Sequence, residues 1–326
     1  MKRIVIVGAG RMAQEYVKVL RMLDSVLIVG VISKTLESAE KFANDNYIQN
    51  FSDINFLRIF IDKLDLSHII LCVPPDKTYD ILEELSGSSY SVLVEKPIGI
   101  NLEESSQIVD LSTKNKLKIY PALNRRFLPA IFTAKQILRE TSLVDNSHPK
   151  YIYVTDQQDT VGARNYGHPK AILDNWHFAN GIHMMDLALS FCEGQILRLN
   201  SNKIEFNKEK YVLNAEIELS SGDKIFYSSF WNLNKKWELG INFGEMDLIL
   251  SPIESLKVVE KNGRDILSTL KVDKLASHHE PEDLKPGLMN IVKWFLGLED
   301  FNLNPEEILY KSHESMGVLN QIYRVK

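Results

Sequence analysis

Short apolar runs alternate with amphipathic stretches over the first 120 residues. Ile4–Val7, Val26–Ile32 and Ser67–Val73 are rich in consecutive apolar residues, a pattern typical of strands buried on both faces. The apolar residues of Met12–Leu23 recur every three or four positions, which predicts a helix. We expect further elements of these kinds at Leu36–Asn44, Asp76–Leu85 and Ser91–Val94. Strands that alternate with helices predict an α/β fold with a doubly wound parallel sheet.

The pattern changes after about residue 150, where successive strands follow one another with short turns. The expected strands are Tyr151–Thr155, Lys210–Ser220, Lys224–Trp231, Trp237–Phe243 and Met246–Leu250. Turns at residues 220–223 and 242–245 favour antiparallel pairing between them. Two helices, Leu284–Leu296 and Pro305–Tyr323, are expected to close the chain. We therefore predict two domains, residues 1–122 with the parallel sheet and residues 123–326 with an α+β fold.

Composition narrows the functional classes. A net charge of −5 argues against nucleic acid as the main partner. Only two cysteines occur, so a disulfide framework or a zinc cluster is not expected. His278-His279-Glu280 is interpreted as a polar loop, and no metal site is predicted. With no signal-peptide pattern and no apolar run long enough for a bilayer, we expect a cytoplasmic protein without a membrane partner.

A glycine-rich turn follows the first strand. The residues Gly8-Ala9-Gly10-Arg11-Met12-Ala13 form a G-x-G-x-x-A sequence between a predicted strand and a predicted helix. In this context Gly8 permits the tight turn, and Gly10 lets a pyrophosphate approach the backbone. The free N–H groups of the following helix would bind the phosphates. A glycine turn without a ligand is the weaker alternative.

The end of the second strand bears on the choice of cofactor. Sites that prefer NAD usually present an acid there to the ribose 2′-hydroxyl. This chain has Ile32-Ser33-Lys34-Thr35 instead. Ser33 could donate a hydrogen bond to a 2′-phosphate, and Lys34 could pair with its charge. We therefore expect NADP to be preferred over NAD, with a solvated surface Lys34 as the alternative.

A lysine stands at the carboxyl end of another predicted strand. Ser91–Val94 leads into Glu95-Lys96-Pro97, at the sheet edge where ligands of open α/β sheets bind. The Lys96 ammonium could stabilise alkoxide charge on an alcohol being oxidised. It could also transfer a proton if burial lowers its pKa. On position alone, a surface lysine paired with Glu95 is equally compatible.

Five segments together give the chain a family resemblance. They are the VGAGRMA turn, Cys72-Val73-Pro74-Pro75, Glu95-Lys96-Pro97, Asn124-Arg125-Arg126-Phe127 and Gly181-Ile182-His183-Met184-Met185-Asp186. In this order and spacing, the chain resembles the glucose–fructose oxidoreductase and inositol 2-dehydrogenase family. The resemblance implies an N-terminal Rossmann domain and a C-terminal domain whose open, mostly antiparallel sheet often forms a homo-oligomer interface. It also implies hydride transfer between a nicotinamide and a sugar, cyclitol or similar substrate.

The resemblance further implies roles for individual residues. Lys96 and His183 would face the nicotinamide as catalytic residues, and the Lys96–Pro97 peptide is expected to be cis. The expected cofactor-binding residues are Gly8, Gly10, Arg11, Met12, Ser33, Lys34, Val73, Pro74, Pro75, Glu95, Lys96 and Asn124. Many family members have a histidine where this chain has Thr78, to which we assign no role.

One position departs from the family pattern D-x-G-x-H-x-x-D. Gly181, His183 and Asp186 match it, but Ala179 replaces the first acid. On a continuous helix that acid would lie beside His183, since residues four apart share a face. His183 could act alone as general acid or base, Asp174 or His177 could replace the acid, or Asn180 could hold the substrate. We favour His183 with Lys96, and we expect Asp186 to be structural.

Candidate substrate residues lie on either side of this segment. Arginines and aromatic rings suit a polyhydroxylated or anionic ligand. The candidates are Arg126, Arg164, Tyr166, Trp176, His177 and Asn180. A surface loop of ordinary polar residues is an equal alternative for the stretch around Arg164.

The sequence thus predicts an NAD(P)-dependent oxidoreductase. Its substrate would be a sugar-like alcohol or ketone, either free or linked to a nucleotide, and its assembly would be a homodimer or homotetramer. Two alternatives are open: an NADP-binding regulator of sugar metabolism, which the loss of the acid at Ala179 favours, and an imine reductase on the same fold.

Overall fold

The computed structural model divides into two compact units. It describes residues 1–115, 117–144, 148–260, 263, 265, 280–281 and 283–324. Unit 1 comprises Met1–Asn124 and Glu280–His313, and unit 2 comprises Arg125–His279 and Glu314–Lys326. The sequence prediction had one boundary, near residue 122. The structure differs because a C-terminal segment returns to unit 1.

Unit 1 is a three-layer α/β unit with a parallel sheet. The strand order is β3-β2-β1-β4-β5-β6, and each neighbouring pair is parallel. Its elements are β1 (Lys2–Val7), α1 (Arg11–Arg21), β2 (Val26–Ser33), α2 (Leu36–Asp45), β3 (Phe51–Asp53), η1 (Ile54–Phe56), α3 (Leu57–Asp62), β4 (His68–Leu71), η2 (Pro75–Lys77), α4 (Thr78–Glu84), β5 (Ser91–Val94), α5 (Leu102–Asn115) and β6 (Lys118–Pro121). This confirms the predicted Rossmann architecture.

The strand order places a switch point at β1. The chain runs from β1 to β2 and β3 on one side of β1 and then crosses to β4 on the other side, so the crevice at the carboxyl ends of β1 and β4 lies where the order reverses. Open α/β sheets bind ligands in such a crevice. The β1 residues Ile4–Val7 and the β4 residues Ile69–Leu71 are essentially inaccessible to solvent, which explains why both strands are continuous apolar runs.

The returning segment adds an aromatic layer to unit 1. It contains α11 (Leu288–Phe295), whose Phe295 ring packs edge-on against His68 at 5.0 Å and against Tyr120 at 5.2 Å. Trp294 contacts Tyr120 in the same way at 4.8 Å. The last helix, α12 (Pro305–Tyr323), begins in unit 1 and ends in unit 2.

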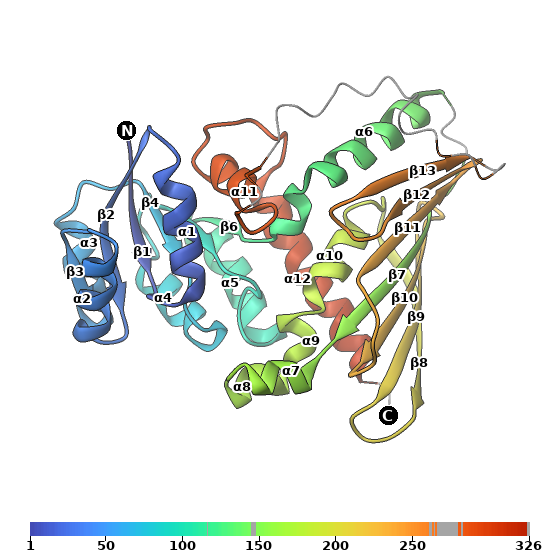
Figure 1. The fold of residues 1–326 in the computed structure, drawn as a ribbon, viewed down its shortest axis with the longest axis horizontal. Helices are drawn as coiled ribbons and strands as arrows, with labels where there is room; N and C mark the ends of the chain where they lie inside the picture. The colour runs from blue at the N-terminus through green and yellow to red at the C-terminus, as the bar shows by residue number, and fades with distance from the viewer. Residues whose placement is uncertain are drawn as a thin grey trace. The chain divides into compact units, whose positions relative to one another are not determined.

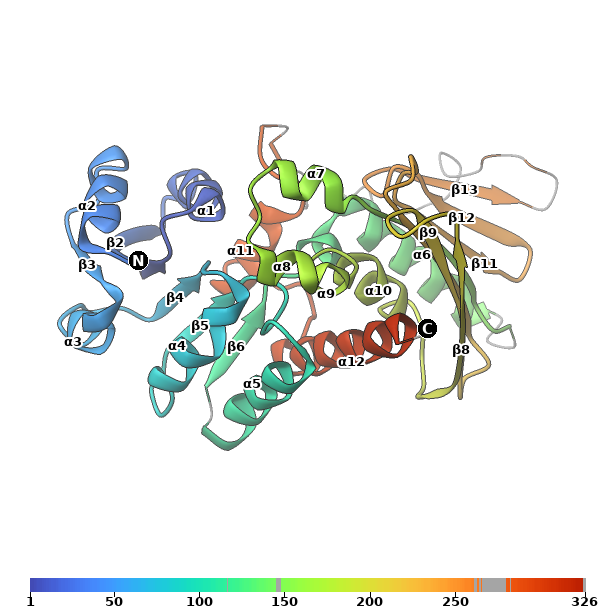
Figure 2. The same ribbon diagram turned by 90° about the horizontal axis from the view of Figure 1, so that it is seen from below.

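Unit 2 is an α+β unit in which helices lie on one face of a sheet (Figures 1 and 2). It begins within η3 (Asn124–Phe127), whose first residue belongs to unit 1. Its elements are α6 (Pro129–Val144), β7 (Tyr151–Gln158), α7 (Thr160–Asn165), α8 (Lys170–Asp174), α9 (Trp176–Ala179), α10 (Ile182–Leu189), β8 (Ile196–Glu205), β9 (Tyr211–Leu219), β10 (Lys224–Trp231), β11 (Glu238–Phe243), β12 (Met246–Leu250) and β13 (Leu256–Glu260).

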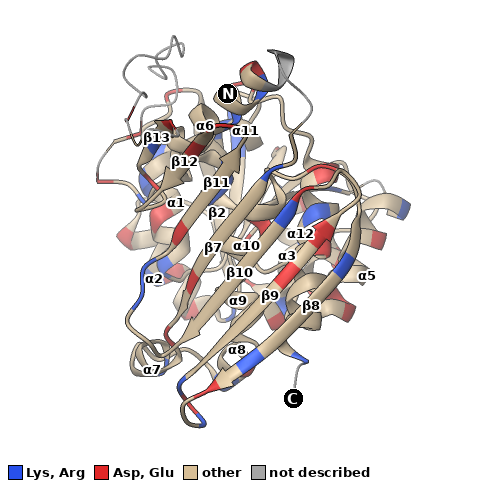
Figure 3. Cartoon of the chain, turned by 90° about the vertical axis from the view of Figure 1, so that its right-hand side faces the viewer, with Lys and Arg blue, Asp and Glu red and all other residues tan. Residues whose placement is uncertain are grey.

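The sheet of unit 2 is mostly antiparallel, as predicted. Its order is β13-β12-β11-β7-β10-β9-β8, and the central pair of β7 and β10 is parallel. Ile152, Val154, Ile225 and Tyr227 point to the helix-covered face and are buried. The opposite face carries Tyr153, which is half-exposed. Figure 3 shows this sheet with few charged residues along β7 and most of β10.

Candidate functional site

The glycine turn after β1 is held against the end of β4. Gly8 has φ +116°, and a Cβ there would lie 2.3 Å from the Cys72 carbonyl oxygen, so any larger residue would collide with backbone. The Gly8 N–H donates to Ile32 O, and the Cys72 N–H donates to Val7 O, both at 2.8 Å. The turn is therefore fixed between β2 and β4, at the switch point.

The start of α1 fits a dinucleotide phosphate group. Gly10 is the N-cap, no side chain caps the helix, and its first turn carries no acid. A Cβ on Gly10 would meet no atom within 4 Å, so the approach to the turn is open. The first N–H groups of a helix have no intrahelical acceptor and bind anions readily. Arg11 is exposed and Met12 half-buried at this end of the helix.

The end of β2 presents hydroxyls and a lysine. Ser33 is buried, and its hydroxyl lies 2.8 Å from that of Ser38, while Lys34 is exposed. Ser33 pairs in register with Asp53 of β3, an acid that sequence reasoning did not consider. The Asp53 carboxylate accepts the N–H of Asn55 at 2.9 Å and thereby caps η1.

Glu95 is tied to the helix that begins at the glycine turn. The buried Tyr16 hydroxyl of α1 donates to Glu95 Oε1 at 2.7 Å. Burial raises the pKa of Tyr16, and the Glu95 carboxylate raises it further. Burial also raises the pKa of the neighbouring Cys72 thiol. The sequence suggested Tyr16 only as an apolar helix position, yet it fixes α1 to the carboxyl end of β5.

Lys96 follows β5 and is half-buried. The Lys96–Pro97 peptide is cis, as the resemblance implied. The Glu95 N–H extends the ladder by donating to Leu71 O at 2.9 Å. This places the Glu95-Lys96-Pro97 segment at the carboxyl edge of the parallel sheet.

The segment after β4 turns sharply at its two prolines. Val73 is half-exposed, Pro74 is the N-cap of η2, and Pro75 is its first residue. The Lys77 N–H donates to Pro74 O at 2.9 Å. Thr78 starts α4 and is almost completely buried.

Asn124 contacts the returning segment. Its side-chain amide donates to Pro286 O at 2.7 Å. Gly287 has φ +78°, and a Cβ there would lie 2.1 Å from Asn124 O, so the two backbones touch. The position predicted to bind cofactor therefore anchors a loop of unit 1.

In unit 2, residues 176–189 form two helices rather than one. Asn180 ends α9, and α10 begins at Ile182. His183 N donates to Asn180 O at 3.2 Å, and a Cβ on Gly181 would lie 2.6 Å from His177 O. The helix that the family pattern implied is therefore interrupted at Asn180 and Gly181, between Ala179 and His183.

Asp186 forms a buried ion pair with Arg126. The guanidinium Nε and Nη2 donate to the two carboxylate oxygens at 2.7 and 2.8 Å. The side chains are 7% and 2% exposed. The ion pair holds Asp186 against Arg126, and the structural role that we expected for Asp186 stays a prediction. Arg126, predicted as a substrate residue, has its guanidinium directed at Asp186.

A cavity of about 440 Å³ lies in unit 2 near His183. Its lining includes two of the predicted substrate residues, Trp176 and Asn180, together with Trp237, Lys236 and Glu254. The His183 ring lies 5.7 Å from the Trp237 ring, and the Arg125 guanidinium lies 5.4 Å from it. The Trp176 indole nitrogen is buried with no hydrogen-bond acceptor among the described residues. This cavity combines aromatic faces with polar groups, as a sugar site requires.

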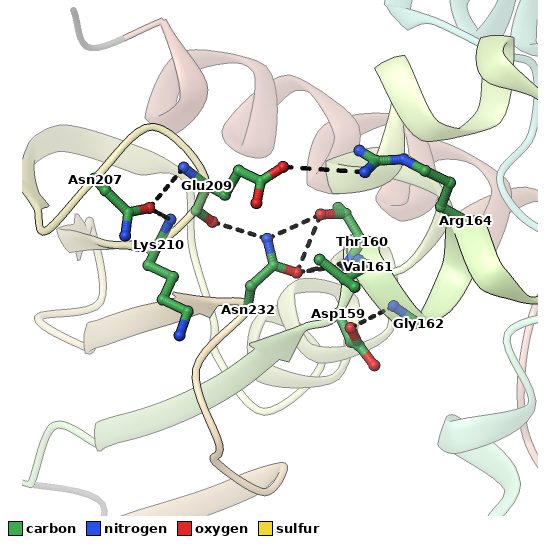
Figure 4. A network of polar contacts seen from close by, with 9 residues as sticks. All are labelled: Asp159, Thr160, Val161, Gly162, Arg164, Asn207, Glu209, Lys210 and Asn232. Atoms are coloured by element: carbon green, nitrogen blue, oxygen red, sulfur yellow. Dashed lines mark hydrogen bonds and ion pairs between the residues drawn. The ribbon is translucent and has the colours of Figure 1, made fainter.

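Asn232 forms hydrogen bonds with the start of α7, just before the predicted Arg164–His168 loop (Figure 4). Its carboxamide oxygen accepts the N–H groups of Thr160 at 2.9 Å and Val161 at 3.2 Å. Its amide group donates to the Glu209 carbonyl at 2.8 Å. Arg164 lies on α7 and reaches the Glu209 carboxylate at 4.0 Å, with 62% of its side chain exposed. Neither Arg164 nor the exposed Tyr166 lines the cavity near His183.

His177 belongs to a buried aromatic and polar cluster. Its ring stacks on Tyr323 at 4.7 Å, and burial lowers its pKa to about 4. In the same cluster the Tyr227 hydroxyl donates to Asp156 Oδ2 at 2.5 Å. Burial raises the pKa of Asp156 to about 7, against hydrogen bonds from Tyr227 and neighbouring residues. Sequence reasoning missed Asp156, because the predicted strand ended at Thr155 whereas β7 continues to Gln158.

Neither a metal centre nor a bilayer-spanning helix occurs in the described part of the chain. No three His, Cys, Asp or Glu side chains gather there as a metal would require. No helix among those residues has the length and apolar content to cross a bilayer. His278 and His279 lie outside the described residues, and the Glu280 carboxylate instead accepts the Asn290 N–H of α11 at 2.9 Å.

The fold and the glycine turn define a class of protein, one with a dinucleotide-binding Rossmann unit and a second unit built on an open, mostly antiparallel sheet. Residues 2–122 match the model of the oxidoreductase family with an NAD-binding Rossmann fold, named GFO_IDH_MocA. Over these residues the chain is similar to that family, and relatives named MocA and inositol 2-dehydrogenase support the likeness.

Curated relatives match over part of their length. Glucose-6-phosphate 3-dehydrogenase of Bacillus subtilis is 27% identical over 145 residues, which are 44% of this chain and 39% of that protein. The rhizopine catabolism protein MocA of Rhizobium meliloti is 24% identical over 42% of each chain. The alignments thus span about two fifths of these relatives.

Solved structures match over nearly the whole chain. UDP-N-acetylglucosamine 3-dehydrogenase GnnA of Acidithiobacillus ferrooxidans has a TM-score of 0.73 and 15% identity. The match covers 98% of this chain and 96% of that one. At this identity the likeness concerns the fold.

Proposed function

We propose that this protein is an NADP(H)-dependent oxidoreductase that acts on a sugar-like alcohol or ketone. The observation that carries the proposal is the cavity beside His183, lined by Trp176, Trp237 and Asn180, in a chain whose residues 2–122 match an NAD-binding oxidoreductase family. Tryptophan faces stack on the apolar faces of sugars, and amides bind hydroxyls. The names of the relatives, which act on a sugar phosphate or a nucleotide sugar, support this substrate class.

Lys96 and His183 are the proposed catalytic residues. When bound, the nicotinamide supplies or accepts the hydride, and the protein controls charge and protons. The Lys96 ammonium stabilises negative charge on the reacting oxygen. His183 exchanges the hydroxyl proton as general acid or base, since an imidazole can both accept and donate a proton. Because Ala179 cannot exchange a proton, this assignment gives His183 the whole proton transfer.

NADP is the proposed preference. Ser33 and Lys34 offer a hydroxyl and a positive charge at the end of β2, where a 2′-phosphate would lie. Asp53 is the nearby acid, and its carboxylate is engaged in capping η1. Equal affinity for NADPH and NADH would contradict this preference.

The test is a substrate panel with matched variants. The protein is incubated with NADP⁺ or NADPH and with sugars, cyclitols, nucleotide sugars and their keto forms, and the absorbance of the reduced nicotinamide is followed. Lys96→Met and His183→Ala should each lower turnover at least about a hundredfold while dinucleotide affinity is kept. Lys118→Met, at the exposed amino end of β6, is the control and should retain turnover.

The panel also separates the alternatives. Dinucleotide binding without turnover of any alcohol or ketone would favour a regulator that senses NADP, the function that Ala179 favours. Turnover of imines alone would favour an imine reductase. Turnover that both catalytic variants retain would refute the proposed roles of Lys96 and His183.

A further inference from the structure

A lysine of the returning segment lies against the glycine turn of unit 1. Lys285 is half-buried, and its Nζ lies 3.2 Å from Sδ of Met12, the second residue of α1. The two residues are 273 positions apart in the chain. No motif in the sequence indicates this contact.

The loop that carries Lys285 is fixed on both sides. Asn124 donates to Pro286 O at 2.7 Å, and Gly287 lies against the Asn124 backbone. The Glu280 carboxylate accepts the N–H groups of Gly287 and Asn290 and so caps α11. Leu288 N donates to Lys285 O at 3.1 Å. Because these contacts hold the backbone, the Lys285 side chain starts from a defined position beside α1.

In this structure the Lys285 ammonium donates to a weak hydrogen-bond acceptor. Among the described residues, the Met12 sulfur is the hydrogen-bond acceptor of Lys285 Nζ, and no carboxylate there forms an ion pair with it. A thioether is a weak acceptor, whereas a phosphate oxygen forms a charge-assisted bond with an ammonium. An anion bound at the glycine turn would therefore stabilise the half-buried Lys285 ammonium.

We infer that Lys285 is a phosphate-binding residue of the dinucleotide site, supplied by the segment that returns to unit 1. This inference rests on the proposed function. The ammonium moves from the Met12 sulfur to a pyrophosphate oxygen held at the first turn of α1. Asn124 acts as a positioning residue, because it holds the backbone next to Lys285.

The experiment measures dinucleotide affinity rather than turnover. NADPH, NADH, ADP and adenosine are titrated into the wild type, Lys285→Met and Lys285→Arg by calorimetry. Lys285→Met should lower the affinity for NADPH, NADH and ADP by about tenfold. The affinity for adenosine should not change, because adenosine has no phosphate. Lys285→Arg should recover most of the affinity. Lys293→Met is the control, since Lys293 lies on α11 and pairs with Glu299 at 3.1 Å.

The outcomes distinguish this inference from the proposed function. Equal affinity of the wild type and Lys285→Met for all ligands would overturn the inference and leave the proposed function standing. A loss confined to NADPH would also overturn it, since it would place the ammonium at the 2′-phosphate. An equal loss in Lys293→Met would point to general weakening of α11 and overturn it as well. A wild type that binds no dinucleotide would refute both proposals.

Discussion

Replacement of Asp186 by Asn should destabilise the protein strongly. Arg126 and Asp186 approach to 2.7 and 2.8 Å, and their side chains are 7% and 2% exposed. At such a separation and an effective dielectric constant of about 20, the attraction is about 6 kcal/mol. Asparagine keeps the shape of the side chain but leaves the Arg126 charge buried without its counter-charge. Loss of one partner of a buried pair costs about 3–5 kcal/mol, and we expect a value in that range.

Urea unfolding followed by tryptophan fluorescence measures this cost. Three of the four tryptophans, Trp176, Trp231 and Trp237, lie in unit 2 with the ion pair, so the signal reports mainly on that unit. Asp174→Asn is the control, because its pair with Lys170 is 56% and 86% exposed. An exposed pair of this kind contributes at most about 1 kcal/mol.

Two results would refute the reasoning about the ion pair. One is a cost below about 1 kcal/mol for Asp186→Asn, which would mean that water or a neighbour compensates the guanidinium. The other concerns a double variant, Arg126→Met with Asp186→Leu, which buries no charge. It should be more stable than Asp186→Asn. A double variant less stable than the single one would show that packing, not charge, decides the cost.

Asp156 and Tyr153 give two further predictions. Burial raises the pKa of Asp156 from 3.8 to about 7, so the folded chain holds this proton more tightly, and the free energy of unfolding falls as the pH rises between those values. Asp156→Asn should therefore gain stability relative to the wild type between pH 5 and pH 8, and a constant difference in urea midpoints would contradict this. Tyr153 is 52% exposed on the outer face of the sheet and stacks on Phe226 at 5.2 Å. We propose this face as the interface of a homodimer or homotetramer. The Tyr153→Arg variant should therefore sediment as a single chain of 37.3 kDa. A wild type that sediments as a single chain at all concentrations would refute this proposal.

Sequence patterns located the buried elements better than the exposed ones. Ser91–Val94 is a strand as predicted, because burial on both faces leaves a continuous apolar run. Ile196–Glu205 is the edge strand β8 and was missed, since most of its residues are at least partly exposed and its apolar and polar positions do not alternate cleanly. The predicted helix over Leu284–Leu296 begins later, at Leu288, because Gly287 adopts φ +78° just before it.

The candidate site was less accessible to sequence reasoning. Motifs indicated Gly8, Lys96 and His183, since the backbone turn and strand end that they need are local features. The helix break at Asn180 and Gly181 was not predicted, because the apolar residues continue through Ile182 and Met184 without a change of pattern. The contact of Lys285 with Met12 joins residues far apart in the chain, and a single sequence contains no pairing information at that range.

The return of Glu280–His313 to unit 1 has a consequence for biosynthesis. A ribosome delivers the chain from its amino end, and domains generally fold as units as they emerge. Here the aromatic residues Trp294 and Phe295, which cover Tyr120 and His68, are synthesised after nearly all of unit 2. Tyr120 and His68 of the parallel sheet therefore lack these aromatic contacts while more than 150 further residues are synthesised. Expression of residues 1–122 alone would leave Tyr120 and His68 permanently without these aromatic partners.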